Sequence, residues 1–242
     1  MKHPLIYIFL VFHLVYGQTD DSRNRFPYPT TPTNQSIWDQ AQTDSTLQVN
    51  PLSYDQIPRY LEFRGNVVEA LTWEDGIGEN ILVQTVTGQF DWKDYLEDSS
   101  EYAIEDKSAL HAYLFVKKKG EKVFQKIWRI YDFMECYGVD WYTGFIPQAT
   151  TVTDVDQDGL SEISLPYVLV CRGGVDPGVM KIIMYEGGEK YALRGETAIL
   201  CETGQPIGGA FKPSSNLENQ SILKEFLIQR WEINKCKKGR FN

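Results

Sequence analysis

The sequence predicts a mainly β protein: an antiparallel β-sheet domain, arranged as a sandwich or as a propeller-blade-like meander, with one C-terminal α-helix. Runs of β-branched and alternating apolar residues are separated by short turns rich in Gly, Asp and Lys. These turns are too short for the crossovers that parallel strands need. Near the end of the chain, apolar residues recur at spacings of three and four, which is typical of a helix.

The composition indicates a folded, acidic protein. The chain has 242 residues, of which 42% are hydrophobic and 13% aromatic, and this excludes a wholly disordered chain. With 24 basic and 33 acidic side chains, the formal charge is −9, which argues against nucleic acid or anionic lipid as a partner. The three histidines are His3, His13 and His111, and we expect the first two to be removed. Metal sites that need two histidines are therefore excluded.

The first 17 residues are typical of a secretory signal peptide. Lys2 precedes an apolar run from Leu5 to Val15, which is shorter than the ~20 residues of a membrane-spanning helix. We expect cleavage after Gly17, no membrane span in the product, and export to the periplasm, the cell surface or the medium. Residues 18–50 are rich in Thr, Pro, Asn, Gln, Asp and Ser and predict a disordered tether.

From residue 51 to 242 we expect a single β-rich domain. Its strands are predicted, in order, at residues 63–73, 81–87, 110–116, 123–133, 163–170, 180–185 and 190–193. The helix is predicted at about residues 221–234, with Ser221 as its N-cap. Its apolar face, which we expect to pack on the sheet, consists of Leu223, Phe226, Leu227 and Trp231.

The sharpest local signal is the acidic stretch TDVDQDGLSE at residues 153–162. Gly159 tolerates positive φ and allows the loop to wrap, so that the three alternating aspartates converge. Six to eight oxygen ligands suit Ca²⁺, and we expect this ion as a structural cofactor. The predicted ligands are the carboxylates of Asp154, Asp156, Asp158 and Glu162 with the carbonyl of Leu160.

This loop is not an EF-hand, because its twelfth position is Leu165 instead of glutamate and strand-like residues follow it. It resembles the shorter calcium loops of FG-GAP-type β-repeats. The alternative is a plain Asp-Gly turn between two strands.

Signals for catalysis are weak. His111 lies in a predicted strand, where a surface or core role is the simpler interpretation. The sequence has no G-x-S-x-G elbow and no phosphate-binding glycine loop before a helix. A carboxylate-pair glycosidase stays open because Asp91, Asp94, Glu97, Asp98 and Glu101 crowd one segment. The aromatic stretch 131–142 fits either sugar stacking or core packing beside a disulfide.

Four cysteines in an exported chain predict disulfides, and three connectivities are open. They are Cys136, Cys171, Cys201 and Cys236. No C-x-x-C pair occurs, which argues against thioredoxin chemistry and zinc knuckles.

Three stretches carry a family resemblance: VTDVDQDGLSEISLPYVLVCRGGVDPG, MKIIMYEGGEKYALRG and FKPSSNLENQSILKEFLIQRW. Together with the export signal they resemble exported proteins of Bacteroidetes-type bacteria named for surface polysaccharide biosynthesis. The resemblance covers about residues 63–231, including the acidic loop, Cys136 and Cys171. We therefore predict a Cys136–Cys171 disulfide, whose cysteines also flank a local β-unit. A Cys201–Cys236 disulfide follows only by elimination.

The resemblance implies an exported accessory or glycan-associated protein that works with cell-surface polysaccharide or its assembly machinery, without turnover. The sequence does not settle whether the protein is an enzyme, and it favours a protein without catalytic activity. The alternative is a carboxylate-based carbohydrate-active enzyme, which would show two carboxylates outside the loop facing each other across a cleft.

Overall fold

The computed structural model describes residues 47–95, 102–137 and 140–236, and in this part the chain is mainly β with antiparallel sheets and one C-terminal helix, as predicted. The first sheet, sheet A, follows the chain as a meander in the order β1-β2-β3-β4-β5. Its strands are β1 (Asn50–Pro51), β2 (Asn66–Glu74), β3 (Gly78–Tyr95), β4 (Tyr102–Lys118) and β5 (Gln125–Glu135).

The second sheet, sheet B, has the order β13-β10-β9-β8-β6, with β7 also paired to β8. Its strands are β6 (Asp140–Phe145), β7 (Thr151–Thr153), β8 (Glu162–Arg172), β9 (Val179–Glu186), β10 (Glu189–Glu196) and β13 (Phe211–Pro213). A separate short pair is formed by β11 (Ala198–Ile199) and β12 (Ile207–Gly208). The 3₁₀ helices are η2 (Tyr54–Gln56), η3 (Cys201–Thr203) and η4 (Ser215–Asn219), and the α-helix is α2 (Ser221–Asn234).

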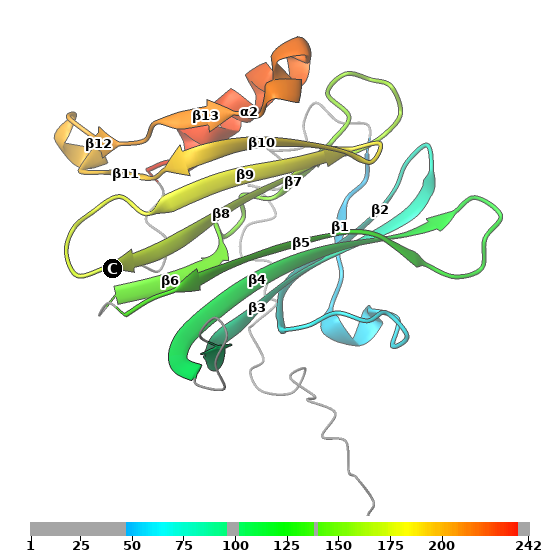
Figure 1. The fold of residues 1–242 in the computed structure, drawn as a ribbon. Helices are drawn as coiled ribbons and strands as arrows, with labels where there is room; N and C mark the ends of the chain where they lie inside the picture. Colours follow the sequence, from blue (N-terminus) through cyan, green and yellow to red (C-terminus); the bar gives the residue numbers. More distant parts are fainter. Residues whose placement is uncertain (1–46, 96–101, 138–139, 237–242) are drawn as a thin grey trace, which may run out of the picture.

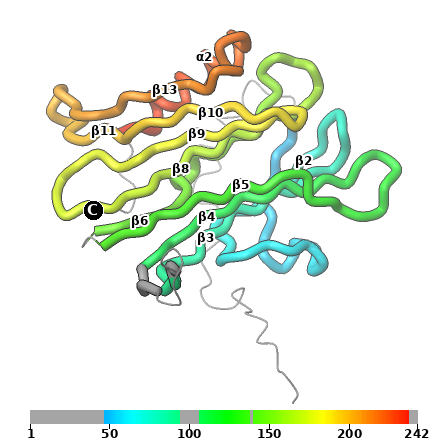
Figure 2. The backbone as a smooth tube through the Cα atoms, in the orientation of Figure 1, coloured from blue at the N-terminus to red at the C-terminus, as the bar shows by residue number. Residues whose placement is uncertain are grey.

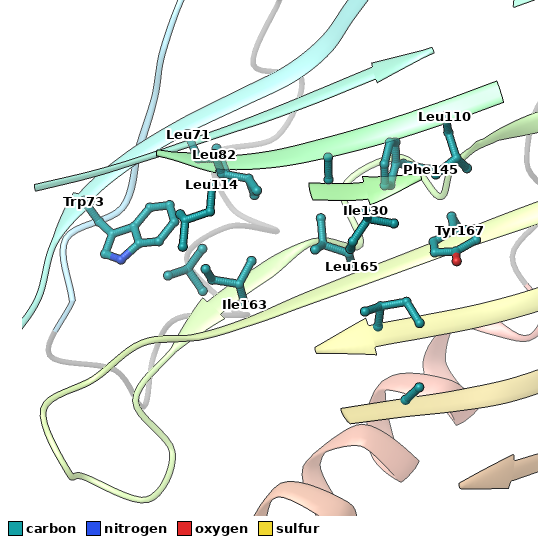
Figure 3. Packing of buried hydrophobic residues seen from close by; sticks show 14 of the residues in the cluster. Leu71, Trp73, Leu82, Leu110, Leu114, Ile130, Phe145, Ile163, Leu165 and Tyr167 are labelled. Carbon is teal, nitrogen blue, oxygen red and sulfur yellow. The ribbon is translucent and has the colours of Figure 1, made fainter. Parts of the chain in front are cut away.

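The main core lies between the two sheets, so the fold is a sandwich (Figures 1 and 3). Strand alternation sends one set of apolar side chains from each sheet into it. Leu82 and Leu114 from sheet A and Ile163 and Leu165 from β8 are among the buried residues that meet there.

Helix α2 covers the other face of sheet B, beside β13, as the ribbon and tube views show (Figures 1 and 2). Leu223, Leu227 and Trp231 are buried and Phe226 is half-buried, so the predicted apolar face does pack on the sheet. The Trp231 Nε1–H donates to the Gly209 carbonyl at 2.9 Å. The helix begins at Ser221 with Gln220 as its N-cap, so the predicted capping role of Ser221 is wrong by one residue.

The outer face of sheet A is partly covered by the segment before β2. Leu52, Ile57, Leu61 and Phe63 pack there against β2, β3 and β4. The predicted signal peptide and most of the predicted tether, residues 1–46, lie outside the described residues. The last four tether residues, 47–50, are described: Leu47 and Val49 pack against the main core and Asn50 pairs in β1. These four residues belong to the folded part instead of the tether.

Both predicted disulfides are present, Cys136–Cys171 and Cys201–Cys236. The first joins the end of β5 to the end of β8 and so ties sheet A to sheet B. Because its two cysteines lie on either side of the acidic loop in the sequence, this bridge is predicted to restrain the loop. The structure instead places the bridge at the opposite end of β8, since Cys171 is near the last residue of that strand and the loop precedes its first. The second ties η3 to Cys236, two residues beyond the end of α2.

Candidate cation site and the cavity beside it

The acidic loop connects β7 to β8, whose facing ends are paired at Thr153 and Glu162. Gly159 has φ of 86°, in the left-handed region that glycine adopts without strain, and a side chain there would meet nothing within 4 Å. The backbone conformation, more than crowding, therefore favours glycine. The Gly159 carbonyl accepts a hydrogen bond of 2.8 Å from the Gly76 N–H, which fixes the loop to the β2–β3 turn.

Backbone N–H groups hold the three aspartates within the loop. Asp154 Oδ2 accepts from the Gly159 N–H at 3.2 Å, Asp156 Oδ1 from the Asp158 N–H at 3.2 Å, and Asp158 Oδ1 from the Leu160 N–H at 2.7 Å. Such Asx turns account for the loop's shape without any ion. The other oxygen of each carboxylate takes no part in these backbone hydrogen bonds.

Glu162 is fully buried at the start of β8. Its carboxylate accepts from Thr153 Oγ1 at 2.9 Å and from the Val155 N–H at 3.0 Å. Burial raises the pKa of Glu162 to about 6, with a smaller upward contribution from the charge of Asp156, while these hydrogen bonds lower it.

A fifth carboxylate comes from outside the loop. Glu186 is the last residue of β9, and its oxygen falls in one group with those of Asp156 and Asp158. A second group contains Asp154, Asp156 and Glu162, and within each group the ligand atoms lie within 4.8 Å of one another. Asp156 belongs to both groups, so the five side chains form one cluster, which we call the acidic cluster.

The acidic cluster contains negative charge that no described residue neutralises. None of its carboxylates forms an ion pair within the described parts of the chain. Asp154 Oδ1 and Glu186 Oε1 are buried and receive no hydrogen bond from described residues. Burial, and then the charges of Asp156, Glu162 and Asp158, raises the pKa of Glu186 to about 7. A bound cation would reduce the repulsion among these carboxylates.

The structure therefore brings four predicted ligand residues together and adds one that the sequence did not indicate. The Leu160 carbonyl stays a predicted ligand. The Leu160 N–H donates to Asp158, and its side chain lies close to Gly76 and Gly187. Glu186 could be found only from the register, which pairs Ile163 with Tyr185 and so places the end of β9 beside the start of β8.

A cavity of about 210 Å³ adjoins the acidic cluster, and Glu186 belongs to both. Trp128 of β5 and Tyr185 of β9 line it and stack on each other with centroids 4.3 Å apart. Asp75 and Ser161 also line it, and the Ser161 hydroxyl donates to Asp75 Oδ2 at 2.6 Å. The cavity thus combines an aromatic pair with fixed polar groups, a combination typical of small-molecule sites.

The other sequence candidates lie elsewhere. His111 is buried on the outer face of sheet A, stacked on Tyr131 with centroids 5.0 Å apart. Burial, and then the charges of Arg129 and Arg64, lowers the pKa of His111 to about 4. Of the carboxylate segment, Asp91 is exposed on β3, whereas residues 96–101 lie outside the described residues.

The aromatic stretch 131–142 divides between two environments. Tyr131 and Phe133 are exposed on the outer face of sheet A, 44% and 38% respectively, so core packing does not explain them. Asp132, between them, points inward and accepts from Tyr167 Oη at 2.8 Å and from Lys181 Nζ at 2.5 Å. The two rings stack on each other with centroids 5.6 Å apart, which occupies faces that a sugar would need.

Comparisons with protein-family models, with curated proteins and with solved structures find no match to this chain. Among the described residues, no helix has the length and apolar character needed to cross a membrane.

Proposed function

We propose that this chain is an exported accessory protein that binds glycan without turnover and uses one structural Ca²⁺ ion in the acidic cluster. The observation that carries the proposal is the convergence of five carboxylates, from a loop and from the end of β9, beside a cavity with a stacked aromatic pair. Hard oxygen ligands of this number suit Ca²⁺. The resemblance to surface polysaccharide biosynthesis proteins supports the choice of glycan as the ligand.

The cation would act as a brace between two hairpins. Asp154 and Asp158 belong to the β7–β8 connection and Glu162 begins β8, whereas Glu186 ends β9. An ion that all of them contact would fix the end of β9 against the loop. Since Glu186 also lines the cavity, the ion would orient one wall of the ligand site.

The two disulfides support export, because such bonds persist mainly in oxidising compartments. They close loops far apart in the fold, one between the sheets and one behind sheet B. The proposed partner is cell-surface polysaccharide or the machinery that assembles it.

A carboxylate-based carbohydrate-active enzyme is the second candidate, because Asp75 and Glu186 line the same cavity. The contacts of Asp75 favour a structural role, since its carboxylate already accepts from Ser161 and from the Ile77 N–H at 2.9 Å. Release of reducing sugar from a bound glycan, abolished by Asp75→Asn, would favour the enzyme over the binding protein.

The proposal is tested by calorimetric titration of the metal-free protein with Ca²⁺. We expect one site, weakened about tenfold or more in Glu186→Gln because a charged ligand is lost. The matched control is Glu189→Gln, which removes the exposed carboxylate paired with Glu186 in register but outside the acidic cluster. No heat of binding, or equal loss in both variants, would contradict a site at the acidic cluster.

Glycan binding is tested separately on a glycan array, with Ca²⁺ and with a chelator. We expect binding to need Tyr185 and to weaken in the chelator. Tyr131→Ala serves as the control, because this exposed tyrosine lies on sheet A away from the cavity. Binding that Tyr185→Ala leaves unchanged would exclude the cavity as the ligand site.

A further inference from the structure

Three adjacent strands of sheet B place cationic side chains directly opposite one another. Arg194 of β10 is paired in register with Lys181 of β9 on one side and with Lys212 of β13 on the other. Directly opposite residues in an antiparallel pair have their Cβ atoms about 5 Å apart, and like charges there repel. We call Lys181, Arg194 and Lys212 the cationic row.

The cationic row faces away from helix α2. Along β10, Tyr191 and Leu193 pack in the core beneath the helix, so strand alternation sends Lys190, Ala192 and Arg194 to the other face. Arg194, Lys212 and Lys190 are exposed and Lys181 is half-buried. The strands that carry them lie side by side in Figures 1 and 2.

Most of this positive charge has no carboxylate partner. Lys181 pairs with Asp132, whereas Lys190, Arg194 and Lys212 form no ion pair with any residue in the described ranges. Glu196 lies two residues beyond Arg194 on the same strand and is not paired with it. Burial, and then the charge of Arg194, lowers the pKa of Lys190, while the charge of Asp132 raises it. A local excess of cations in a chain of net charge −9 is the reverse of its overall character.

Lys190, which lies on the same face of β10 as Arg194, is close to the proposed ligand site. Lys190 Nζ lies 6.0 Å from the centre of the Tyr185 ring, and Tyr185 lines the cavity beside the acidic cluster. Between Tyr185 and the cationic row this face carries Ala192 and Ile183, which are buried in the main core, so the exposed ends of Lys190, Arg194 and Lys212 are the groups that a ligand could reach.

The geometry points to an acidic polysaccharide, a chain of carboxylate-bearing sugars, as the ligand class of this protein, bound across β9, β10 and β13 by the cationic row. This inference rests on the proposed association with glycan and specifies its charge. The carboxylates of the ligand would neutralise Arg194 and Lys212 as Asp132 neutralises Lys181, and guanidinium groups bind carboxylates in a two-point geometry. Such binding must weaken as salt screens the charges.

The test measures binding of polygalacturonate, with neutral dextran as the uncharged probe, in a chelator. The chelator removes the Ca²⁺ bridges that polyuronates themselves form, and it separates this inference from the cation proposal. We expect polygalacturonate to bind at low salt, and dextran not to bind. The double variant Arg194→Gln/Lys212→Gln should weaken binding about tenfold or more.

The matched control is Lys119→Gln/Lys122→Gln, which removes two charges from the exposed turn between β4 and β5. It should leave binding unchanged, and both double variants should melt at or above the wild-type temperature. Equal weakening by both variants, or equally tight binding of duplex DNA, would overturn the inference, because any polyanion would then bind by net charge. If polygalacturonate binds but the Ca²⁺ titration shows no site, the inference about the cationic row holds and the structural ion is contradicted. If Ca²⁺ binds but polygalacturonate does not, only the inference about the cationic row is contradicted.

Discussion

The acidic cluster and the cationic row lie on the same sheet, yet they hold their charges in opposite ways. The acidic cluster gathers the carboxylates of one loop and of Glu186 closely together, with two unpaired carboxylate oxygens buried and with the pKa of Glu162 and of Glu186 raised. The cationic row lies mainly in solvent, where long side chains separate their charges. Like-charge repulsion is therefore strong in the acidic cluster and weak in the cationic row. Only the acidic cluster should lower the free energy of unfolding strongly.

The largest effect is expected from the helix that supports both regions from behind. Trp231→Ala removes a fully buried ring and its hydrogen bond to Gly209, and we expect a loss of about 3 to 5 kcal/mol of unfolding free energy. Denaturant unfolding measures it. Ile233→Ala, at a position 54% exposed on the same helix, is the control and should change stability by less than about 0.5 kcal/mol. Equal small effects would mean that α2 does not support sheet B.

A buried base on sheet A should show the opposite pH dependence from the acidic cluster. The pKa of His111 is lowered to about 4 from an ordinary 6.5, so the unfolded chain binds its proton first and acid favours unfolding. We expect this residue to cost about 3 kcal/mol between pH 7 and pH 4, a slope that His111→Asn removes. An NMR titration of His111 with a midpoint near 6.5 would contradict this.

Removal of one charge from the acidic cluster should raise the free energy of unfolding even without any metal. The pKa of Glu186 is raised to about 7, so its charge opposes folding above that pH and ceases to do so as the pH falls towards 4.5. In a chelator at pH 8, Glu186→Gln should gain about 1 kcal/mol, a value reduced for solvent screening, and the gain should shrink as the pH falls below about 7 and vanish only below about pH 4. Glu225→Gln, which removes an exposed carboxylate of α2, is the control and should show no such pH dependence. A loss of stability in Glu186→Gln at pH 8 would show that no repulsion is stored.

The smallest effect is expected at the cationic row. Arg194→Gln removes a charge directly opposite two others and should stabilise the free protein by about 0.2 to 1 kcal/mol at low salt. The gain should shrink in 1 M NaCl, where the charges are screened. A clear loss of stability would show that Arg194 makes a structural contact instead of awaiting a ligand.

The comparison also shows which features a sequence can predict. The acidic loop is readable because Asp154, Asp156 and Asp158 are neighbours along the chain and Gly159 marks the turn. The strands and the helix are equally local, since they follow from periodicities of two and of three to four residues. The predicted N-cap, Ser221, differs by one residue from the observed N-cap, Gln220. Both residues are polar, and only their backbone angles determine which of them precedes the helix.

Features that depend on register could not be predicted. Lys181, Arg194 and Lys212 are widely spaced in the chain and meet only through the pairing of β9, β10 and β13. Glu186 joins the acidic cluster for the same reason, and the Trp128–Tyr185 pair forms across two sheets. The alternation of Tyr131, Asp132 and Phe133 was visible, but which face meets the other sheet was not.

The most direct test of the structural ion is differential scanning calorimetry of the unmutated protein in Ca²⁺ and in a chelator, beside Glu186→Gln. An ion that binds only the folded state should add about 2.7 kcal/mol at a hundredfold excess over its Kd, so the melting temperature of the unmutated protein should rise with Ca²⁺. In Glu186→Gln most of that rise should be lost. Identical melting of the unmutated protein in Ca²⁺ and in chelator would leave the acidic loop as a plain Asp-Gly turn and contradict the account.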